Sequence, residues 1–202
     1  MARRHACIFG GGGHARVVAS LIRAATVTFV VPNPTRADHL AESAFFERIE
    51  DYASQDVYIG IGDNDIRRGI FDRLASLGIT PASCVAPTAF IAASASLGRG
   101  VVVCPGGVVM ANAEVGANVI VNTLSSVDHD CVVGDHSQIT AGVTLGGTVT
   151  LGRGCFLGIK SAVLPNLTLG DAVVVMAGSL VTGAVPGHVM VGGSPARIVR
   201  TL

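Results

Sequence analysis

Large aromatic side chains and charged residues are both scarce in this chain of 202 residues. It has no Trp, two Tyr and seven Phe, and only 14% of its residues are charged. The 14 basic and 14 acidic residues cancel, so no net charge attracts nucleic acid, and we expect no nucleic-acid partner. Hydrophobic residues make up 50% of the chain, which excludes a disordered protein.

Long apolar runs are also missing. Each run is broken by Gly, Pro or a charged residue well short of the ~20 residues that a membrane-spanning helix needs, so we expect no membrane association. The basic start at residues 1–5 is followed by only four apolar residues before the first glycine. That stretch is too short for the apolar part of a signal peptide, and the chain is therefore predicted to be cytoplasmic.

The cysteines lack any metal-binding or disulfide pattern. The five are widely spaced, with no C-x-x-C pair. We therefore expect no metal site and no disulfide framework, and we interpret the cysteines as small buried thiols.

A period of six residues runs through the second half of the chain. From Ile91 to Val181 every sixth residue is Ile, Leu or Val, sixteen in succession. A helix has a period of 3.6 residues and a flat strand a period of 2, so neither fits. The pattern indicates a parallel β-helix, in which each six-residue segment forms one side of a coil and the aliphatic side chains fill a narrow interior. The scarcity of aromatic residues agrees with such an interior.

The first part of the chain has a different pattern. Strands are predicted at residues 6–9, 27–31 and 57–62, and helices at residues 17–22 and about 66–77. Gly10, Gly12 and Ala15 match G-x-G-x-x-A between the first strand and helix, where glycines let a phosphate approach a helix N-terminus. Asn33 stands where a dinucleotide fold would place an acidic residue, which favours a mononucleotide or nucleotide sugar over NAD. The alternative is a glycine turn with a packing role alone.

The two halves together carry a recognisable set of motifs. They read GGHA at residues 12–15, GIGDN at 60–64, DHDC at 128–131, LPN at 164–166 and GSPA at 193–196. In this set the chain resembles the sialic-acid O-acetyltransferase family of hexapeptide-repeat acyltransferases, and most closely its nucleotide-amino-sugar N-acetyltransferases. The resemblance implies a Rossmann-like α/β domain at residues 1–82 that binds a nucleotide sugar. It further implies a left-handed parallel β-helix at residues 83–202 that binds acetyl-CoA in a homotrimer.

The resemblance assigns catalysis to His129, which matches the histidine of the family pattern x-x-H-[ED]-C. Asp130 matches its acidic neighbour, which would orient the imidazole as it takes a proton from the acceptor. With three six-residue segments per coil, Gly147 lies one coil beyond His129, and the resemblance makes its N–H the oxyanion donor. The alternative for His129 is a solvated turn residue.

The resemblance also implies two sets of binding residues. Gln138 stands where some family members have a second histidine, and we expect the nearby His136 to be an exposed turn residue. The substrate set comprises Gly10, Gly12, Gly13, His14, Asn33, Gly62, Asp63, Asn64 and Gln138. The acetyl-CoA set comprises Gly146, Gly147, Gly158, Ile159, Lys160, Pro165, Gly178, Pro195 and Arg197. A helix-capping role for His14 and a solvated Lys160 remain alternatives, and His5, His39 and His188 receive no role.

These inferences predict an acetyl-CoA-dependent N-acetyltransferase that acts on the 4-amino group of a nucleotide-linked amino-deoxy sugar. Transfer is expected to be direct, without a metal. Two alternatives stay open: a sugar O-acetyltransferase of the sialic-acid type, and a non-catalytic β-solenoid that binds sugar nucleotides. The nucleotide base, the sugar and the acyl chain length stay open as well.

Overall fold

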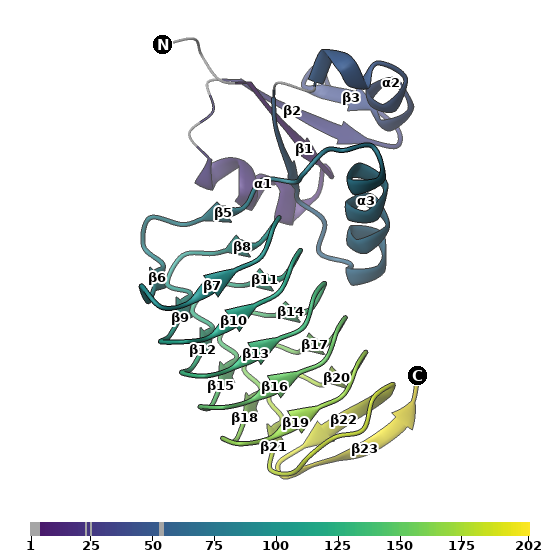
Figure 1. Cartoon of the computed structure of the whole chain (residues 1–202). Coiled ribbons are helices and arrows are strands. Elements are labelled where there is room, and N and C mark those ends of the chain that lie inside the picture. The colour runs from purple at the N-terminus through teal and green to yellow at the C-terminus, as the bar shows by residue number, and fades with distance from the viewer. Residues whose placement is uncertain (1–4, 23, 25, 53–54) are drawn as a thin grey trace. The chain divides into compact units, whose positions relative to one another are not determined.

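The computed structural model describes residues 5–22, 24, 26–52 and 55–202, so the basic start at residues 1–4 lies outside the described residues. The chain divides into two compact units, Met1–Cys84 and Val85–Leu202. The predicted domain boundary, after residue 82, lies two residues before this division. Figure 1 shows the sheet and helices of the first unit and the stacked coils of the second.

The first unit is built on a four-stranded parallel sheet with the order β3-β2-β1-β4. Its strands are β1 (His5–Phe9), β2 (Thr26–Val31), β3 (His39–Ala41) and β4 (Asp56–Ile59). Its helices are α1 (Gly13–Leu21), α2 (Glu42–Glu47), the 3₁₀ helix η1 (Ile49–Tyr52) and α3 (Asn64–Ser76). The sequence pattern predicted β1, β2, β4, α1 and α3, but not the short β3, α2 and η1.

The second unit is a left-handed parallel β-helix of two-residue strands, three to a coil. One sheet contains β7 (Ser96–Leu97), β10 (Glu114–Val115), β13 (Val132–Val133), β16 (Thr150–Leu151) and β19 (Thr168–Leu169). A second contains β6 (Phe90–Ile91), β9 (Val108–Val109), β12 (Ser126–Val127), β15 (Thr144–Leu145), β18 (Ala162–Val163) and β21 (Leu180–Val181). The third contains β5 (Cys84–Val85), β8 (Val102–Val103), β11 (Ile120–Val121), β14 (Gln138–Ile139), β17 (Phe156–Leu157), β20 (Val174–Val175), β22 (Val189–Gly193) and β23 (Ala196–Thr201).

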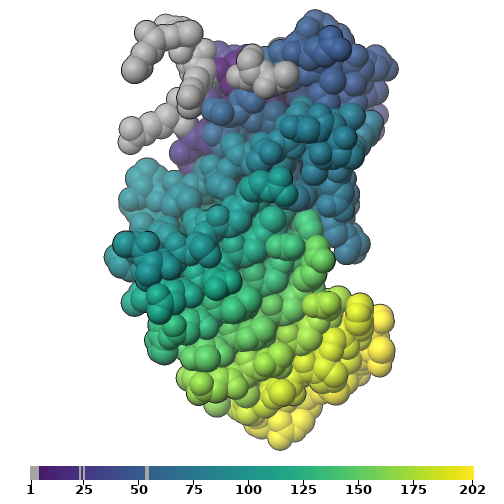
Figure 2. Space-filling model, in the orientation of Figure 1, coloured from purple at the N-terminus to yellow at the C-terminus, as the bar shows by residue number. Residues whose placement is uncertain are grey.

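Each two-residue strand pairs with the strand one coil away, 18 residues along the chain. Glu114 pairs with Val132, for example, and Val132 with Thr150. Figure 2 shows the coils of this unit following one another in chain order, from teal to yellow. The last pair, β22 and β23, is an antiparallel hairpin that extends the third sheet and contains the GSPA motif of residues 193–196.

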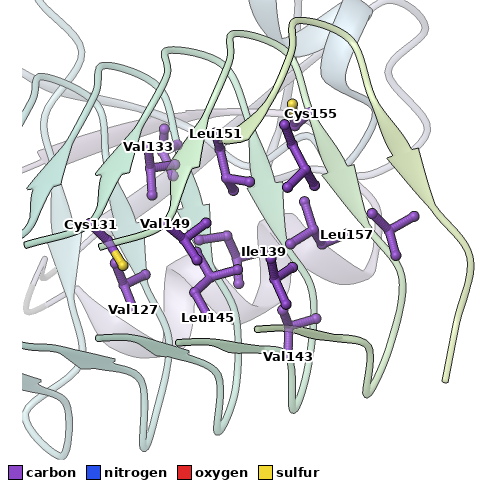
Figure 3. Packing of buried hydrophobic residues seen from close by; sticks show 14 of the residues in the cluster. Val127, Cys131, Val133, Ile139, Val143, Leu145, Val149, Leu151, Cys155 and Leu157 are labelled. Atoms are coloured by element: carbon purple, nitrogen blue, oxygen red, sulfur yellow. The ribbon is translucent and has the colours of Figure 1, made fainter. Parts of the chain in front are cut away.

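The repeated aliphatic residues form the core of the β-helix. The fourteen from Val103 to Val181 are buried, and the first two, Ile91 and Leu97, are partly buried. Figure 3 shows part of this core, in which side chains such as Val133, Ile139 and Leu145 point inward from the three sides of the coils. Their uniform size lets each coil repeat the backbone path of the coil before it, which sustains the register.

Truncating one residue of this core should therefore destabilise the protein. We expect Leu145→Ala to lower the free energy of unfolding by about 2–5 kcal/mol, because Leu145 is fully buried and its removal leaves a cavity. Thr144→Ala is the matched control, since Thr144 is the exposed residue of the same strand. Denaturant unfolding measures both variants, and equal stabilities would contradict this account of the core.

None of the helices in the described part of the chain is long and apolar enough to cross a membrane.

Candidate active site

His129 lies at the corner of the β-helix that joins β12 to β13. Its side chain is 56% exposed, and its Nδ1 lies 2.8 Å from Oδ2 of Asp130. Its backbone N–H donates a hydrogen bond of 2.7 Å to Oδ1 of Asp128. The ring is therefore fixed by a carboxylate partner although it is open to solvent.

Asn112 extends this pair into a chain of three side chains. Its amide nitrogen donates a 3.0 Å hydrogen bond to Oδ1 of Asp130, whose other oxygen faces His129. The two residues stand 18 positions apart, so the stacking of the coils places Asn112 next to Asp130. The sequence analysis missed Asn112, although the same 18-residue step backward from Asp130 would have found it.

Gly147 lies one coil beyond His129. Because Gly147 has no side chain, the imidazole of His129 can occupy the space beside it. A Cβ atom on Gly147 would lie 2.5 Å from Nε2 of His129 and 2.6 Å from its Cε1. On either side of Gly147, the Gly146 N–H donates to the Val163 carbonyl and the Thr148 N–H donates to the His129 carbonyl. The Gly147 N–H donates to no other residue in the described part of the chain. A residue with an unpaired backbone donor thus adjoins the outer nitrogen of the imidazole.

The carboxylates around His129 set its protonation. The pKa of His129 is raised, chiefly by its hydrogen bond to Asp130 and further by the charge of Asp128. The pKa of Asp130 is lowered by the hydrogen bonds from His129 and Asn112. Because the ionised Asp130 accepts from Nδ1–H, the neutral imidazole keeps its lone pair on Nε2, the atom that faces Gly147.

The glycine turn of the first unit joins β1 to α1. Gly10 has a φ of 109° and a Cβ there would lie 2.8 Å from the Gly60 carbonyl oxygen, so this position requires glycine. At Gly12, Gly13 and Gly62 a Cβ would meet no atom within 4 Å, so these residues border open space. The start of α1 adjoins that space, and the free N–H groups of a helix N-terminus can bind an anion.

His14 and Arg67 form the buried side of this turn. Nε2 of His14 is buried without a hydrogen-bond partner among the described residues, and burial, followed by the charge of Arg67, lowers the pKa of His14 to about 4. Arg67 is 1% exposed and donates to the Gly62 carbonyl at 3.1 Å and to Oδ1 of Asn64 at 2.8 Å. Asp63 caps α3 by accepting from two backbone N–H groups. The sequence analysis missed Arg67, which stands in the first turn of the predicted helix.

The residues predicted to bind acetyl-CoA fall in three places. Gly146 and Pro165 adjoin the His129 corner, and a Cβ on Gly146 would lie 2.8 Å from Pro165. Ile159 and Lys160 are exposed at a different corner, between β17 and β18, and Gly178 stacks one coil beyond Lys160. Gly158 is buried, and a Cβ there would lie 2.5 Å from the Ala177 nitrogen, so the stacking of coils itself requires this glycine.

Pro195 and Arg197 belong to the C-terminal hairpin. Arg197 is exposed and helps to line a cavity of about 250 Å³ together with Val181, Val191 and Ile198. Asn33 is exposed directly after β2. In the part of the chain that the structure describes, no three His, Cys, Asp or Glu residues converge in a way that could hold a metal ion.

Gln138 lies on the third sheet, and His136 lies on the corner that precedes it. Both are away from the His129 corner of the same chain. Gln138 is 7% exposed, and its Oε1 has no hydrogen-bond partner among the described residues. The expectation that His136 is an exposed turn residue is wrong, because it is only 6% exposed. Its Nδ1 lies 2.9 Å from the amide nitrogen of Asn118. Asn118 stands one coil earlier, so stacking buries the ring that its turn position alone would leave exposed.

The His129–Asp130 contact predicts a measurable change in titration. We expect Asp130→Asn to lower the pKa of His129 toward its ordinary value of about 6.5, because the charged hydrogen-bond acceptor is lost. The titration is followed by the imidazole Hε1 signal in NMR. Asp171→Asn is the control, since Asp171 binds the Arg153 N–H at another corner. An unchanged His129 pKa in Asp130→Asn would contradict the ion pair.

Comparisons with known proteins place the chain among sugar-modifying acyltransferases. Residues 5–74 match the family model described as the PglD N-terminal domain. A mutant of the perosamine N-acetyltransferase of Caulobacter crescentus, in complex with CoA and GDP-perosamine, is 32% identical with a TM-score of 0.90, and the match covers 98% of each chain.

Two further structures are similar over nearly the whole chain. The acetyltransferase domain of PglB from Neisseria gonorrhoeae, in complex with acetyl coenzyme A, is 28% identical with a TM-score of 0.91, over 98% of this chain and all of that one. WeeI from Acinetobacter baumannii, at 22% identity and a TM-score of 0.72 over 97% of this chain and 100% of that one, shares the fold. The architecture, the motifs and the full-length match to the perosamine enzyme lead to one conclusion: the chain belongs to the sugar N-acetyltransferases of the hexapeptide-repeat acyltransferase family.

Proposed function

We propose that the protein transfers an acetyl group from acetyl-CoA to the 4-amino group of a nucleotide-linked amino-deoxy sugar. The observation that carries the proposal is the Asp130–His129 pair, whose Nε2 faces Gly147, a residue with an unpaired N–H. The relatives with bound CoA, acetyl-CoA and GDP-perosamine support the choice of donor and acceptor. Such enzymes act where acetyl-CoA and nucleotide sugars are made, so we also propose a cytoplasmic location.

The arrangement at the corner suits direct transfer. The sugar amine attacks the thioester carbonyl carbon and gives a proton to Nε2 of His129, while Asp130 stabilises the resulting imidazolium. The Gly147 N–H donates to the carbonyl oxygen as it becomes negative. When the tetrahedral intermediate collapses, the carbon–sulfur bond breaks and the thiolate takes up the proton from His129. CoA leaves as the thiol, and the amide product remains.

The first unit is proposed to hold the nucleotide part of the acceptor. Gly12, Gly13 and Gly62 border the open space in front of α1, which suits a diphosphate. Arg67 fixes the backbone at Gly62 and the side chain of Asn64. His14 is neutral at pH 7 because its pKa is lowered, so it can bind a ligand without adding charge. Asn33 is proposed to approach the ribose or base.

A homotrimer would bring together two of the three parts of the acetyl-CoA set, those at the His129 corner and at the Lys160 corner. His129 lies between the sheets of β12 and β13, whereas Lys160 lies between those of β17 and β18, on another edge of the coil. One bound acetyl-CoA could therefore contact the His129 edge of one copy and the edge of Ile159, Lys160 and Gly178 of a second copy. Three copies around a common axis would close this heterologous contact into a ring.

The reaction is tested by release of the CoA thiol. Acetyl-CoA is offered with UDP-, GDP- and dTDP-linked 4-amino-4,6-dideoxy sugars, and with free sialic acid as the contrasting acceptor. We expect release with a nucleotide amino sugar, and a loss of about 100-fold or more in kcat/KM for His129→Gln. His188→Asn is the control, since Asn tolerates the left-handed backbone of that exposed position.

Two results would count against this proposal. Release of CoA with sialic acid alone would favour the O-acetyltransferase. If none of the acceptors causes release of CoA, a non-catalytic binding β-solenoid is favoured.

The shared site is tested by complementation. His129→Gln and Ile159→Asp are each expected to be nearly inactive alone, because each damages a different edge of every site. Co-expressed with different tags and purified through both, the mixed oligomers should regain a substantial part of the wild-type activity. Mixed oligomers without regained activity, or a monomer by light scattering, would refute the shared site.

A further inference from the structure

The imidazole of His39 lies against the glycine turn, although no motif surrounds this residue in the sequence. His39 is the first residue of β3, its side chain is only 11% exposed, and its ring packs edge-on against Phe29 with centroids 6.2 Å apart. A Cβ atom on Gly11 would lie 3.7 Å from Cε1 and 3.8 Å from Nε2 of His39. The outer part of the ring therefore adjoins the turn that precedes α1.

The hydrogen bonding of the ring determines what Nε2 offers. The backbone N–H of Thr35 donates to Nδ1 at 3.3 Å, so Nδ1 carries the lone pair. The neutral ring then carries its proton on Nε2, as a donor. Within the described residues Nε2 makes no hydrogen bond, since the nearest carboxylate oxygen, of Asp38, lies 4.0 Å away. That carboxylate is held instead by Arg36 at 3.1 Å.

The donor and the turn are arranged to act on the same anion. Gly12 and Gly13 border open space at the start of α1, and the preceding residue, Gly11, lies next to the His39 ring. Burial against Phe29 and the bond from Thr35 fix the direction of the ring, so little freedom is lost when a ligand binds. A side-chain donor on one side and helix N–H groups on the other would then bracket a phosphate.

We propose that His39 is a binding residue for the nucleotide sugar, with Nε2–H donating a hydrogen bond to the diphosphate held at the glycine turn. The inference rests on the proposed function, because it requires a nucleoside diphosphate as the ligand. It adds a residue from β3 to a set that the sequence analysis, within the first unit, drew only from the ends of β1, β2 and β4.

Two substitutions separate a contact with the ligand from a structural role in the loop. His39→Gln can place an amide donor near the position of Nε2, and His39→Asn can keep an acceptor for the Thr35 N–H while it loses the distant donor. Binding of GDP, UDP and dTDP is measured by calorimetry on the full-length protein, with His5→Asn as the control. We expect His39→Asn to weaken binding of the preferred diphosphate about tenfold or more. His39→Gln should stay much closer to wild type.

The KM values of the two substrates should respond differently to the substitution. In His39→Asn the KM for the nucleotide sugar should rise, whereas the KM for acetyl-CoA should not. If His39→Asn binds as wild type does, or if Asn preserves binding and Gln does not, the proposal is overturned and His39 only anchors the loop. If the wild-type protein binds none of the three diphosphates, the nucleotide-linked acceptor of the proposed function fails, and the role of His39 fails with it.

Discussion

The structure of the second unit depends on one constraint, the 18-residue register between stacked strands. Each two-residue strand is hydrogen-bonded only to the strands one coil before and after it, so no strand is stable alone. The aliphatic residue of every segment faces inward and packs on its counterparts, which makes a slip of even one residue costly. Once this register is set, every corner residue has a defined neighbour 18 positions away.

The candidate catalytic geometry follows from that register more than from local conformation. Asn112 reaches Asp130, and Gly147 leaves space for the imidazole of His129, each across a single coil step. Such contacts need no flexible loop, because rigid coils hold both partners. An exposed carboxylate–imidazole pair would ordinarily be weakly ordered. Here the Asn112 amide restrains the carboxylate from the far side.

The parts that the sequence predicted well are those with a repeated or local signal. The six-residue period determined the core, and the step of 18 positions correctly placed Gly147 beside His129. The burial of His136 was mispredicted because its partner, Asn118, belongs to another coil and a turn residue was assumed to face solvent. His39 went unrecognised for a related reason. The strand it begins is three residues long, and its relation to Gly11 exists only once β3 has joined the sheet.

His129 and His14 differ in the surroundings that set their protonation. His129 is exposed, and the adjacent carboxylates raise its pKa, which makes it a stronger base. His14 is buried beside a guanidinium, and its lowered pKa of about 4 keeps it neutral at pH 7. A group that never gains a proton cannot serve as the base, but it can bind a ligand with constant strength. The electrostatics therefore suit the two proposed tasks, with proton transfer at the β-helix corner and ligand binding at the glycine turn.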